Sequence, residues 1–147
     1  MKAWNRTGGR WTSLRLGIVL AATAACGSSP IALHLIGEPM QNRRNSVVVH
    51  VYQLSGRLNF DRADTATFWK DDAAALGAEL LDKKDVMMLP DDRQTRAINL
   101  VPKAQYIGVV ADFMRPEVEG WKRIVAVGAV KHNRITIRIK EGQLSIE

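Results

Sequence analysis

Short apolar segments separated by polar turns run along residues 31–147 and predict a chain built mainly of strands. The segment Ser46–Leu54 (SVVVHVYQL) is β-branched and nearly continuous, which is typical of a strand at the centre of a sheet. Ile135, Ile137 and Ile139 alternate with polar residues, as expected of a strand with one face in water. The pattern gives eight strand candidates, at residues 31–36, 46–54, 86–89, 95–101, 106–113, 121–127, 135–139 and 143–146.

Residues 59–84 break this pattern, because they are rich in alanine and leucine and poor in β-branched residues. We expect two or three short helical turns here. Asp61 is placed to cap the first turn, and Asp71 and Asp72 are placed to start the second. The sequence therefore predicts one domain at 31–147: a mainly β, two-sheet antiparallel sandwich with a short helical insertion at about 59–84.

The N-terminal segment has the organisation of a secretory signal. Four basic residues without an acidic one precede an apolar run at Leu16–Ala25, which ends in small residues. Ten residues span roughly 15 Å as a helix, whereas a bilayer core needs about 30 Å, so the run is too short to be a transmembrane anchor. We expect residues 1–25 to be removed, which leaves 122 of the 147 residues for one domain and its tether.

Cys26 is the single cysteine of the chain and directly follows the apolar run. Thr23–Cys26 resembles a bacterial lipobox, in which the cysteine sulfur takes a diacylglycerol and becomes the first residue of the mature protein. The alternative is cleavage after Ala24 by a general signal peptidase. That would leave a free thiol without a partner in the chain, in an oxidising compartment.

Acylation of Cys26 removes this thiol, so we expect lipidation there, with residues 26–30 as the acylated cysteine and a small, flexible tether. Gly27 stands where an aspartate would indicate retention at the inner membrane, and the resemblance to bacterial lipoproteins implies sorting to the outer membrane. Several acyl chains, each CH₂ contributing about 0.8 kcal/mol, would hold the protein there on the periplasmic face. The covalent lipid on Cys26 is the only bound group expected, with no further cofactor.

The charge balance argues against a nucleic-acid partner. The chain carries 21 basic and 15 acidic residues, but four of the basic residues lie in the signal, which leaves 17 against 15. A nucleic-acid-binding protein usually shows a basic stripe or a recognisable motif. Here acidic and basic residues are interspersed, so nucleic acid is not an expected partner.

Residue types that could carry catalysis are present but are not arranged for it. His34, His50 and His132 have no ligand at helical or strand spacing, so no metal site is predicted. The adjacent aspartates at 71–72 and 91–92 suit a helix start and a turn better than a general acid and base. We therefore predict no catalytic residues and no enzyme. Aromatic and methionine pairs (Trp69 with Trp121, and Met87 with Met88) are interpreted as packing.

Six segments of the chain, taken in order, carry a family resemblance: Val47–Leu54, Phe60–Asp64, Phe68–Leu81, Val86–Asp92, Tyr106–Phe113 and Trp121–Val127. Following the lipobox, they resemble the outer-membrane lipoproteins of the bacterial type VI secretion system, the TssJ (VasD/SciN) family. The resemblance implies a transthyretin-like sandwich and a role as an outer-membrane-anchored periplasmic adaptor. It also implies binding to the periplasmic C-terminal region of the inner-membrane protein TssM, and through it an indirect link to TssL.

The family resemblance implies that the connection between the first two strands, here Gly37–Asn45, contacts TssM. Its composition is suited to binding, because Met40 is apolar and adaptable, and Arg43 and Arg44 can each bind a carboxylate through two hydrogen bonds. The alternative is an ordinary solvated loop. The predicted contact residues are Glu38, Met40, Gln41, Asn42, Arg43 and Arg44.

A second hypothesis is a free-standing periplasmic lipoprotein that carries or senses a small apolar ligand between its sheets. Such a protein needs a cavity of roughly 300 Å³ or more. The isoleucines at 135, 137 and 139 favour a filled sandwich instead.

Overall fold

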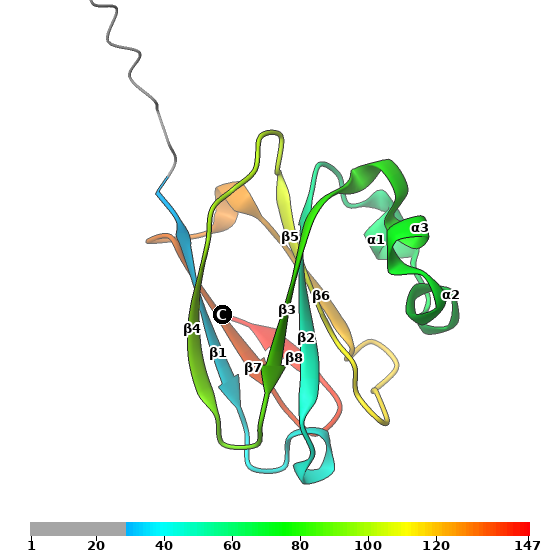
Figure 1. Cartoon of the computed structure of the whole chain (residues 1–147), viewed down its shortest axis with the longest axis vertical. Helices are drawn as coiled ribbons and strands as arrows, with labels where there is room; N and C mark the ends of the chain where they lie inside the picture. The colour runs from blue at the N-terminus through cyan, green and yellow to red at the C-terminus, as the bar shows by residue number, and fades with distance from the viewer. Residues whose placement is uncertain (1–28) are drawn as a thin grey trace, which may run out of the picture.

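The computed structural model describes residues 29–147, which form two four-stranded sheets packed face to face (Figure 1). The first sheet has the order β4 (Arg93–Ile98), β1 (Ile31–Gly37), β7 (Arg134–Ile139) and β8 (Leu144–Ile146). The second has the order β3 (Leu80–Met88), β2 (Val47–Leu54), β5 (Tyr106–Ala111) and β6 (Lys122–Ala126). The predicted mainly β, two-sheet sandwich is confirmed.

Strand alternation fills the space between the sheets. In β7 the three isoleucines predicted to face inward are 0–2% exposed, and β1 shows the same alternation. In β2 the last four residues are all buried, because one face packs on the opposite sheet and the other is covered by the helices. One strand pair departs from the antiparallel pattern: β1 runs parallel to β7, with Leu33 opposite Ile135.

Three short α-helices cover the outer face of the second sheet (Figure 1): α1 (Leu58–Arg62), α2 (Thr65–Lys70) and α3 (Asp72–Leu76). Asp64 and Asp71 cap α2 and α3, since their carboxylates accept hydrogen bonds from backbone N–H groups at 2.8 and 2.9 Å. Phe60 and Phe68 anchor the helices against the sheet and are each 1% exposed.

The helical insertion is shorter than the predicted 59–84. It ends with the 3₁₀ turn η2 (Gly77–Glu79), and β3 begins at Leu80 instead of Val86. The charged run 82–85 does not resemble a buried strand, but β3 is an edge strand whose charged side chains face solvent while its backbone pairs with β2. The predicted cap Asp61 is also wrong, because its carboxylate accepts from Arg57 Nε at 2.7 Å.

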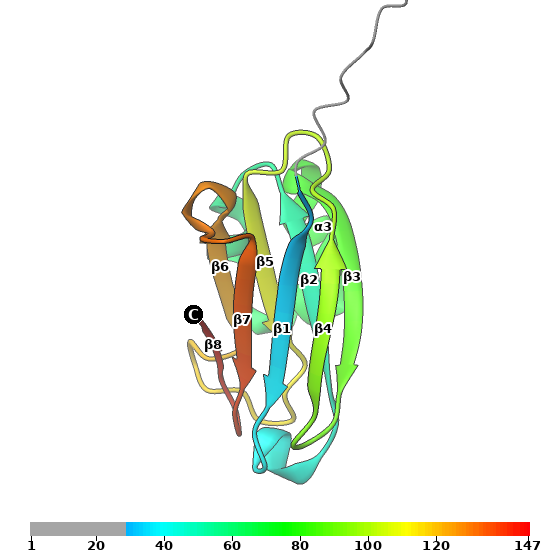
Figure 2. The same ribbon diagram turned by 90° about the vertical axis from the view of Figure 1, so that its left-hand side faces the viewer.

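The two ends of the sandwich carry different connections. β1 starts at one end, beside the β4–β5 connection and the β6–β7 connection, which contains the 3₁₀ turn η3 (Val127–Ala129) (Figures 1 and 2). It finishes at the opposite end, where the β1–β2 connection holds the 3₁₀ turn η1 (Gln41–Arg44). The β1–β2 connection is the segment that the sequence singled out for partner binding.

Candidate functional site

The β1–β2 connection has a defined backbone. Asn42, Arg43 and Arg44 all have positive φ, at 43°, 57° and 65°, which is the left-handed region that non-glycine residues rarely occupy in succession. The backbone N–H of Glu38 donates to the Ile139 carbonyl at 2.9 Å, so the connection stays attached to the first sheet. A chain in this conformation requires side chains that hold it in place.

Gln41 holds the connection to the end of β3. Its side chain is fully buried, and its Nε2 donates to the Met88 carbonyl at 2.9 Å. Its Oε1 is buried without a hydrogen-bond partner among the described residues. Gly37 leaves room for this packing, since a Cβ there would lie 2.7 Å from the Leu89 carbonyl oxygen.

Asn42 makes the second link, toward the β5–β6 connection. Its side chain is 3% exposed. Its Nδ2 donates to the Ser46 carbonyl at 2.7 Å, and its Oδ1 accepts from the Met114 backbone N–H at 2.8 Å. Asparagine tolerates the left-handed backbone better than most residues.

The structure therefore divides the six predicted contact residues into two groups. Gln41 and Asn42 point into the domain and hold the connection. Their side chains are hydrogen-bonded to the backbone of Met88, Ser46 and Met114, so they are not on the surface as a contact role would require. Met40, Arg43 and Arg44 are exposed, and Glu38 is half-buried. Whether the exposed group contacts TssM remains a prediction.

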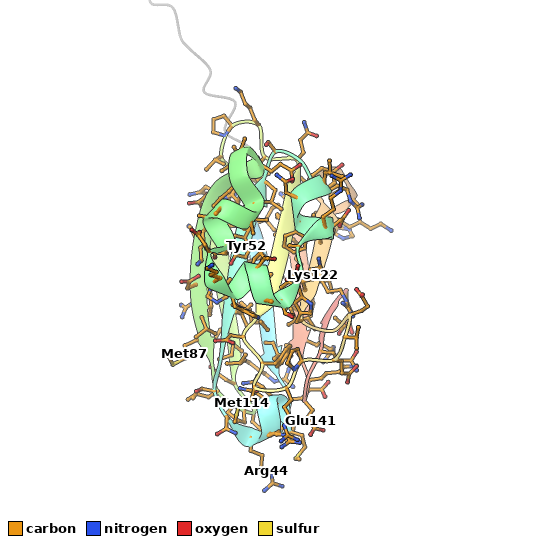
Figure 3. The ribbon with its side chains drawn as sticks, turned by 90° about the vertical axis from the view of Figure 1, so that its right-hand side faces the viewer. Arg44, Tyr52, Met87, Met114, Lys122 and Glu141 are labelled. Atoms are coloured by element: carbon orange, nitrogen blue, oxygen red, sulfur yellow. The ribbon has the colours of Figure 1, made fainter. Side chains whose placement is uncertain are left out.

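Neighbouring connections extend this exposed group. Met114 is 66% exposed on the β5–β6 connection, and Leu89 is 56% exposed on the β3–β4 turn. Arg44 and Met114 project at the same end of the molecule (Figure 3), and Arg44 Nε lies 3.3 Å from the Met40 sulfur. We call Met40, Arg43, Arg44, Leu89 and Met114 the end surface. Sequence analysis missed both residues: Leu89 falls in the strand candidate 86–89, whereas β3 ends at Met88, and Met114 is a single apolar residue in a connection, which gives no signal of its own.

A polar cluster on the helical side of the second sheet ties α3 to the strands. The Tyr52 hydroxyl and Lys83 Nζ both donate to Asp72 Oδ2, each at 2.6 Å. Burial, and next the hydrogen bond to Asp72, raise the pKa of Tyr52 far above its usual value. Partial burial pushes the pKa of Asp72 up, but the bonds from Lys83 and Tyr52 outweigh it, so the pKa of that carboxyl lies below its ordinary value.

Lys122 ties α1 to β6. Its Nζ donates to three backbone carbonyls, of Phe60, Asp61 and Ala63, at 2.7, 2.9 and 2.7 Å. These carbonyls lie at and beyond the end of α1, where helix carbonyls have no partner within the helix. Burial lowers the pKa of the Lys122 ammonium. Both this lysine and the Asp72 cluster hold helices on the sheet.

The remaining candidates for chemistry are dispersed. Within residues 29–147, no group of three or more His, Cys, Asp or Glu side chains could hold a metal ion. Trp121 is 3% exposed, as its interpretation as a packing residue requires, whereas Trp69 is 38% exposed at the edge of the helices. Met88 is buried as predicted, but Met87 is 62% exposed.

Two surface clefts of the described domain exceed the size that a small ligand needs: a polar one of about 440 Å³ beside Lys122, and a more apolar one. The more apolar cleft has a volume of about 740 Å³ and lies between β6 and the β7–β8 edge. Its apolar lining includes Val125, Val130, Ile135 and Ile146, and Lys131, His132 and Arg134 add positive or polar groups. The interior of the sandwich is filled, as the isoleucines of β7 suggested.

The predicted lipidation site lies outside the described residues. Cys26 belongs to the segment 1–28, for which the structure gives no placement. In the part of the chain that the structure describes, no helix is both long and apolar enough to span a bilayer.

The fold and its loops define the class of protein: a small β-sandwich domain that presents structured connections at both ends. The chain belongs to the family described as "Type VI secretion lipoprotein, VasD, EvfM, TssJ, VC_A0113", whose profile matches residues 31–142. The family resemblance found in the sequence is therefore confirmed. No match was found among curated proteins.

Solved structures share the fold at low sequence identity. The T6SS lipoprotein TssJ1 from Pseudomonas aeruginosa has a TM-score of 0.72 and 17% identity, over 81% of this chain and 95% of that chain. A chain of the structure described as "Type VI membrane complex" has a TM-score of 0.74 and 23% identity, over 81% of this chain and 98% of that chain. A chain of the structure described as "T6SS protein TssM C-terminal domain (869-1107) from EAEC" has a TM-score of 0.72 and 21% identity, over 82% of this chain and 98% of that chain.

Proposed function

We propose that this lipoprotein is a non-enzymatic adaptor of a type VI secretion membrane complex, anchored in the outer membrane through a lipid on Cys26. Its end surface binds the periplasmic C-terminal region of TssM, and TssM connects it indirectly to TssL. The supporting observations are family membership and the likeness to chains in structures described as a type VI membrane complex and a TssM C-terminal domain.

The observation that carries the proposal is the course of β1. The strand starts at Ile31, directly after the tether in the sequence, and finishes at the opposite end of the sandwich, at the β1–β2 connection (Figure 2). Its seven residues span about 23 Å at the usual rise of a strand. A domain anchored through Cys26 therefore carries the end surface on the side away from the anchor.

The end surface has the chemistry of a protein contact. Methionines at 40 and 114 supply polarizable apolar groups that adapt to a partner surface. Arg43 and Arg44 supply planar donors suited to carboxylates. Since Gln41 and Asn42 fix the backbone beneath these side chains, less conformational entropy is lost when they bind.

The test is binding of the mature chain, made with Cys26→Ser so that it is unacylated, to the periplasmic C-terminal region of the cognate TssM. Alanine at Met40, Arg43 and Arg44 together should weaken binding by at least about tenfold, since interface contacts of this kind each contribute about 1 kcal/mol. A matched control carries alanine at three positions of the opposite end, namely Lys103, Lys131 and Arg134, and should bind like the parent chain.

The possible outcomes distinguish the adaptor role of the protein from the assignment of that role to the end surface. Binding that survives the triple substitution would keep the adaptor role but overturn its assignment to the end surface. No binding by a chain shown by circular dichroism to be folded would overturn the role in this complex.

The anchor is tested separately in the native host. Mass spectrometry of the mature protein should find a diacylglycerol on Cys26, and Cys26→Ser should move the protein from the outer-membrane fraction to the soluble periplasm and abolish secretion. Full secretion by a soluble, unacylated form would show that anchoring is not needed.

A second candidate function is the binding of a small apolar ligand, and the cleft between β6 and the β7–β8 edge is the observation in its favour. Native mass spectrometry of protein purified from its host would detect a bound small molecule. A substitution that fills the cleft, Ala129→Trp, should then displace it.

A further inference from the structure

The end of the sandwich at which β1 starts is basic. Lys103 lies on the β4–β5 connection, Lys131 and His132 on the β6–β7 connection, and Arg134 is the first residue of β7. All four side chains are exposed. We call these four residues the basic end.

The basic end surrounds the start of β1. In the first sheet β1 lies between β4 and β7, with Ala32 opposite Ala97 on one side and Arg134 on the other. The Ala32 backbone N–H also donates to the Asn133 carbonyl at 2.8 Å, so the β6–β7 connection is attached to the first residues of the strand. Both basic connections therefore flank the place where the tether meets the domain.

The backbone of these connections is held in tight turns. Lys103, His132 and Asn133 have positive φ, at 71°, 53° and 50°. The Ala104 N–H donates to the Val101 carbonyl and the Arg134 N–H donates to the Lys131 carbonyl, both at 3.1 Å. The cationic side chains thus project from turns with fixed geometry.

The cations of the basic end have no internal counter-charge. In residues 29–147, no carboxylate lies within 4.0 Å of the cationic nitrogens of Lys103, Lys131 or Arg134. Glu147 lines the same cleft as Lys131 and Arg134, but its carboxylate accepts from Arg138 Nε at 2.9 Å. Two acidic residues lie at the same end, at the start of β3, but neither pairs with these cations: Glu79 Oε2 accepts from the Asn59 N–H at 2.9 Å, and Asp82 Oδ2 accepts from Gln53 Nε2 at 3.1 Å. The opposite end also mixes both signs, as Arg44 and Glu141 show in Figure 3.

The length of the tether limits how far the basic end lies from the lipid. Four residues, 27–30, separate the acylated cysteine from Ile31, and the five residue steps from Cys26 to Ile31 span at most about 18 Å when fully extended. Electrostatic attraction to a charged surface acts over a Debye length of about 8 Å at physiological salt. A tether this short lets the unpaired cations come within a Debye length of an anionic membrane surface, where the attraction can hold them.

We propose that the basic end binds the anionic headgroups of phospholipids in the membrane that holds the lipid anchor. This inference rests on the proposed anchoring at Cys26. The contact orients the domain: with Lys103 and the Lys131–Arg134 turn on the membrane, the long axis of the sandwich stands upright and the end surface points away from the bilayer. The lipid alone would fix the position of the protein but leave its orientation free.

The experiment uses the mature chain with Cys26→Ser, so that no acyl chain contributes to binding. Its partition is measured by co-flotation with vesicles of phosphatidylcholine containing phosphatidylglycerol, and with vesicles of phosphatidylcholine alone. We expect binding to the anionic vesicles only, lost at high salt. Changing Lys103, Lys131 and Arg134 to glutamine should lower the partition about 100-fold, because each basic residue near an anionic surface contributes about fivefold.

A matched control removes the same charge from the opposite end. The control variant carries Arg43→Gln, Arg44→Gln and Arg115→Gln, so its net charge equals that of the first triple variant. Its partition into anionic vesicles should stay within about threefold of the parent chain. Equal losses in both variants would overturn the proposal, because they would mean that net charge alone drives binding. Equal partition into neutral and anionic vesicles would overturn it as well.

These results do not depend on whether Cys26 is acylated or whether TssM is bound. If the chain does not bind vesicles but a diacylglycerol is found on Cys26 in the host, the basic end is rejected as a lipid-binding surface and the anchor is kept. Vesicle binding without acylation in the host would keep the lipid-binding surface and reject the proposed anchor.

Discussion

Replacing Asn42 tests whether buried side chains shape the β1–β2 connection. In Asn42→Ala the Ser46 carbonyl and the Met114 N–H each lose a hydrogen bond, of 2.7 and 2.8 Å. At a net value of about 1 kcal/mol per bond this costs about 2 kcal/mol. The backbone adds to the cost, because alanine at φ 43° is disfavoured by about 1 kcal/mol more than asparagine. The expected loss is about 3 kcal/mol in the free energy of unfolding.

Two further variants separate these contributions. Asn42→Gly removes the same hydrogen bonds but accepts the left-handed backbone, so it should lose about 1 kcal/mol less than Asn42→Ala. Asn133→Ala changes a residue with φ 50° whose side chain makes no hydrogen bond within the described part of the chain, so it should lose only about 1 kcal/mol.

The assay is urea unfolding followed by tryptophan fluorescence, with the slope of the transition compared between variants. A loss below about 1 kcal/mol for Asn42→Ala would refute the reasoning, because water would then replace both bonds without cost. Binding to the TssM region should also weaken in Asn42→Ala, although the side chain is buried, because Met40 and Arg43 lose their support. Unchanged affinity would show that the shape of the connection does not matter for binding.

Three other substitutions test the packing of the helices on the sheet. A Cβ at Gly108 would lie 2.6 Å from the buried Phe60 ring, so Gly108→Ala should cost about 1–3 kcal/mol in urea unfolding, and an unchanged midpoint would contradict this packing. Lys122→Met should cost about 2 kcal/mol in the same assay, because three carbonyls lose a charged donor; a loss under about 0.5 kcal/mol would mean that water replaces it. The pKa of Asp72 is lower in the folded protein than in the unfolded chain, so its ionised carboxylate stabilises the fold. This stabilisation is fully present above the unfolded pKa of about 3.9 and is lost as the pH falls through the folded pKa. Asp72→Asn should accordingly flatten the fall in urea midpoint toward acid pH, and an acid limb as steep as that of the parent would exclude this role.

The core of the fold could be predicted from the sequence because it depends on local patterns. The alternation at Ile135–Ile139 was enough to predict which face of β7 points inward, and the apolar run at Val47–Leu54 was enough to predict a central strand. The start of β3 could not be predicted in the same way. Charged residues at 82–85 can face solvent only because β3 is an edge strand, and the position of a strand in a sheet is a property of the whole fold.

The candidate site was predictable only in part, for a related reason. The family resemblance pointed to the β1–β2 connection, and the composition of that connection was compatible with binding through Met40, Arg43 and Arg44. Neither could show that Gln41 and Asn42 are buried, because their partners at Met88 and Met114 lie 47 and 72 residues further along the chain. Polar residues in a loop are usually solvated, and non-local hydrogen bonds are what reverse that expectation here.

The position of β1 between β4 and β7 determines how the domain would bear load. If the anchor pulls on the start of this strand and a partner pulls at the connection beyond its end, tension runs along the strand axis. The backbone hydrogen bonds to β4 and β7 lie across that axis, so they are loaded in shear and share the force, whereas bonds at a peeled edge break one after another. A central strand joining both attachment points would thus make the sandwich resist stretching between two membranes without any disulfide in the described domain.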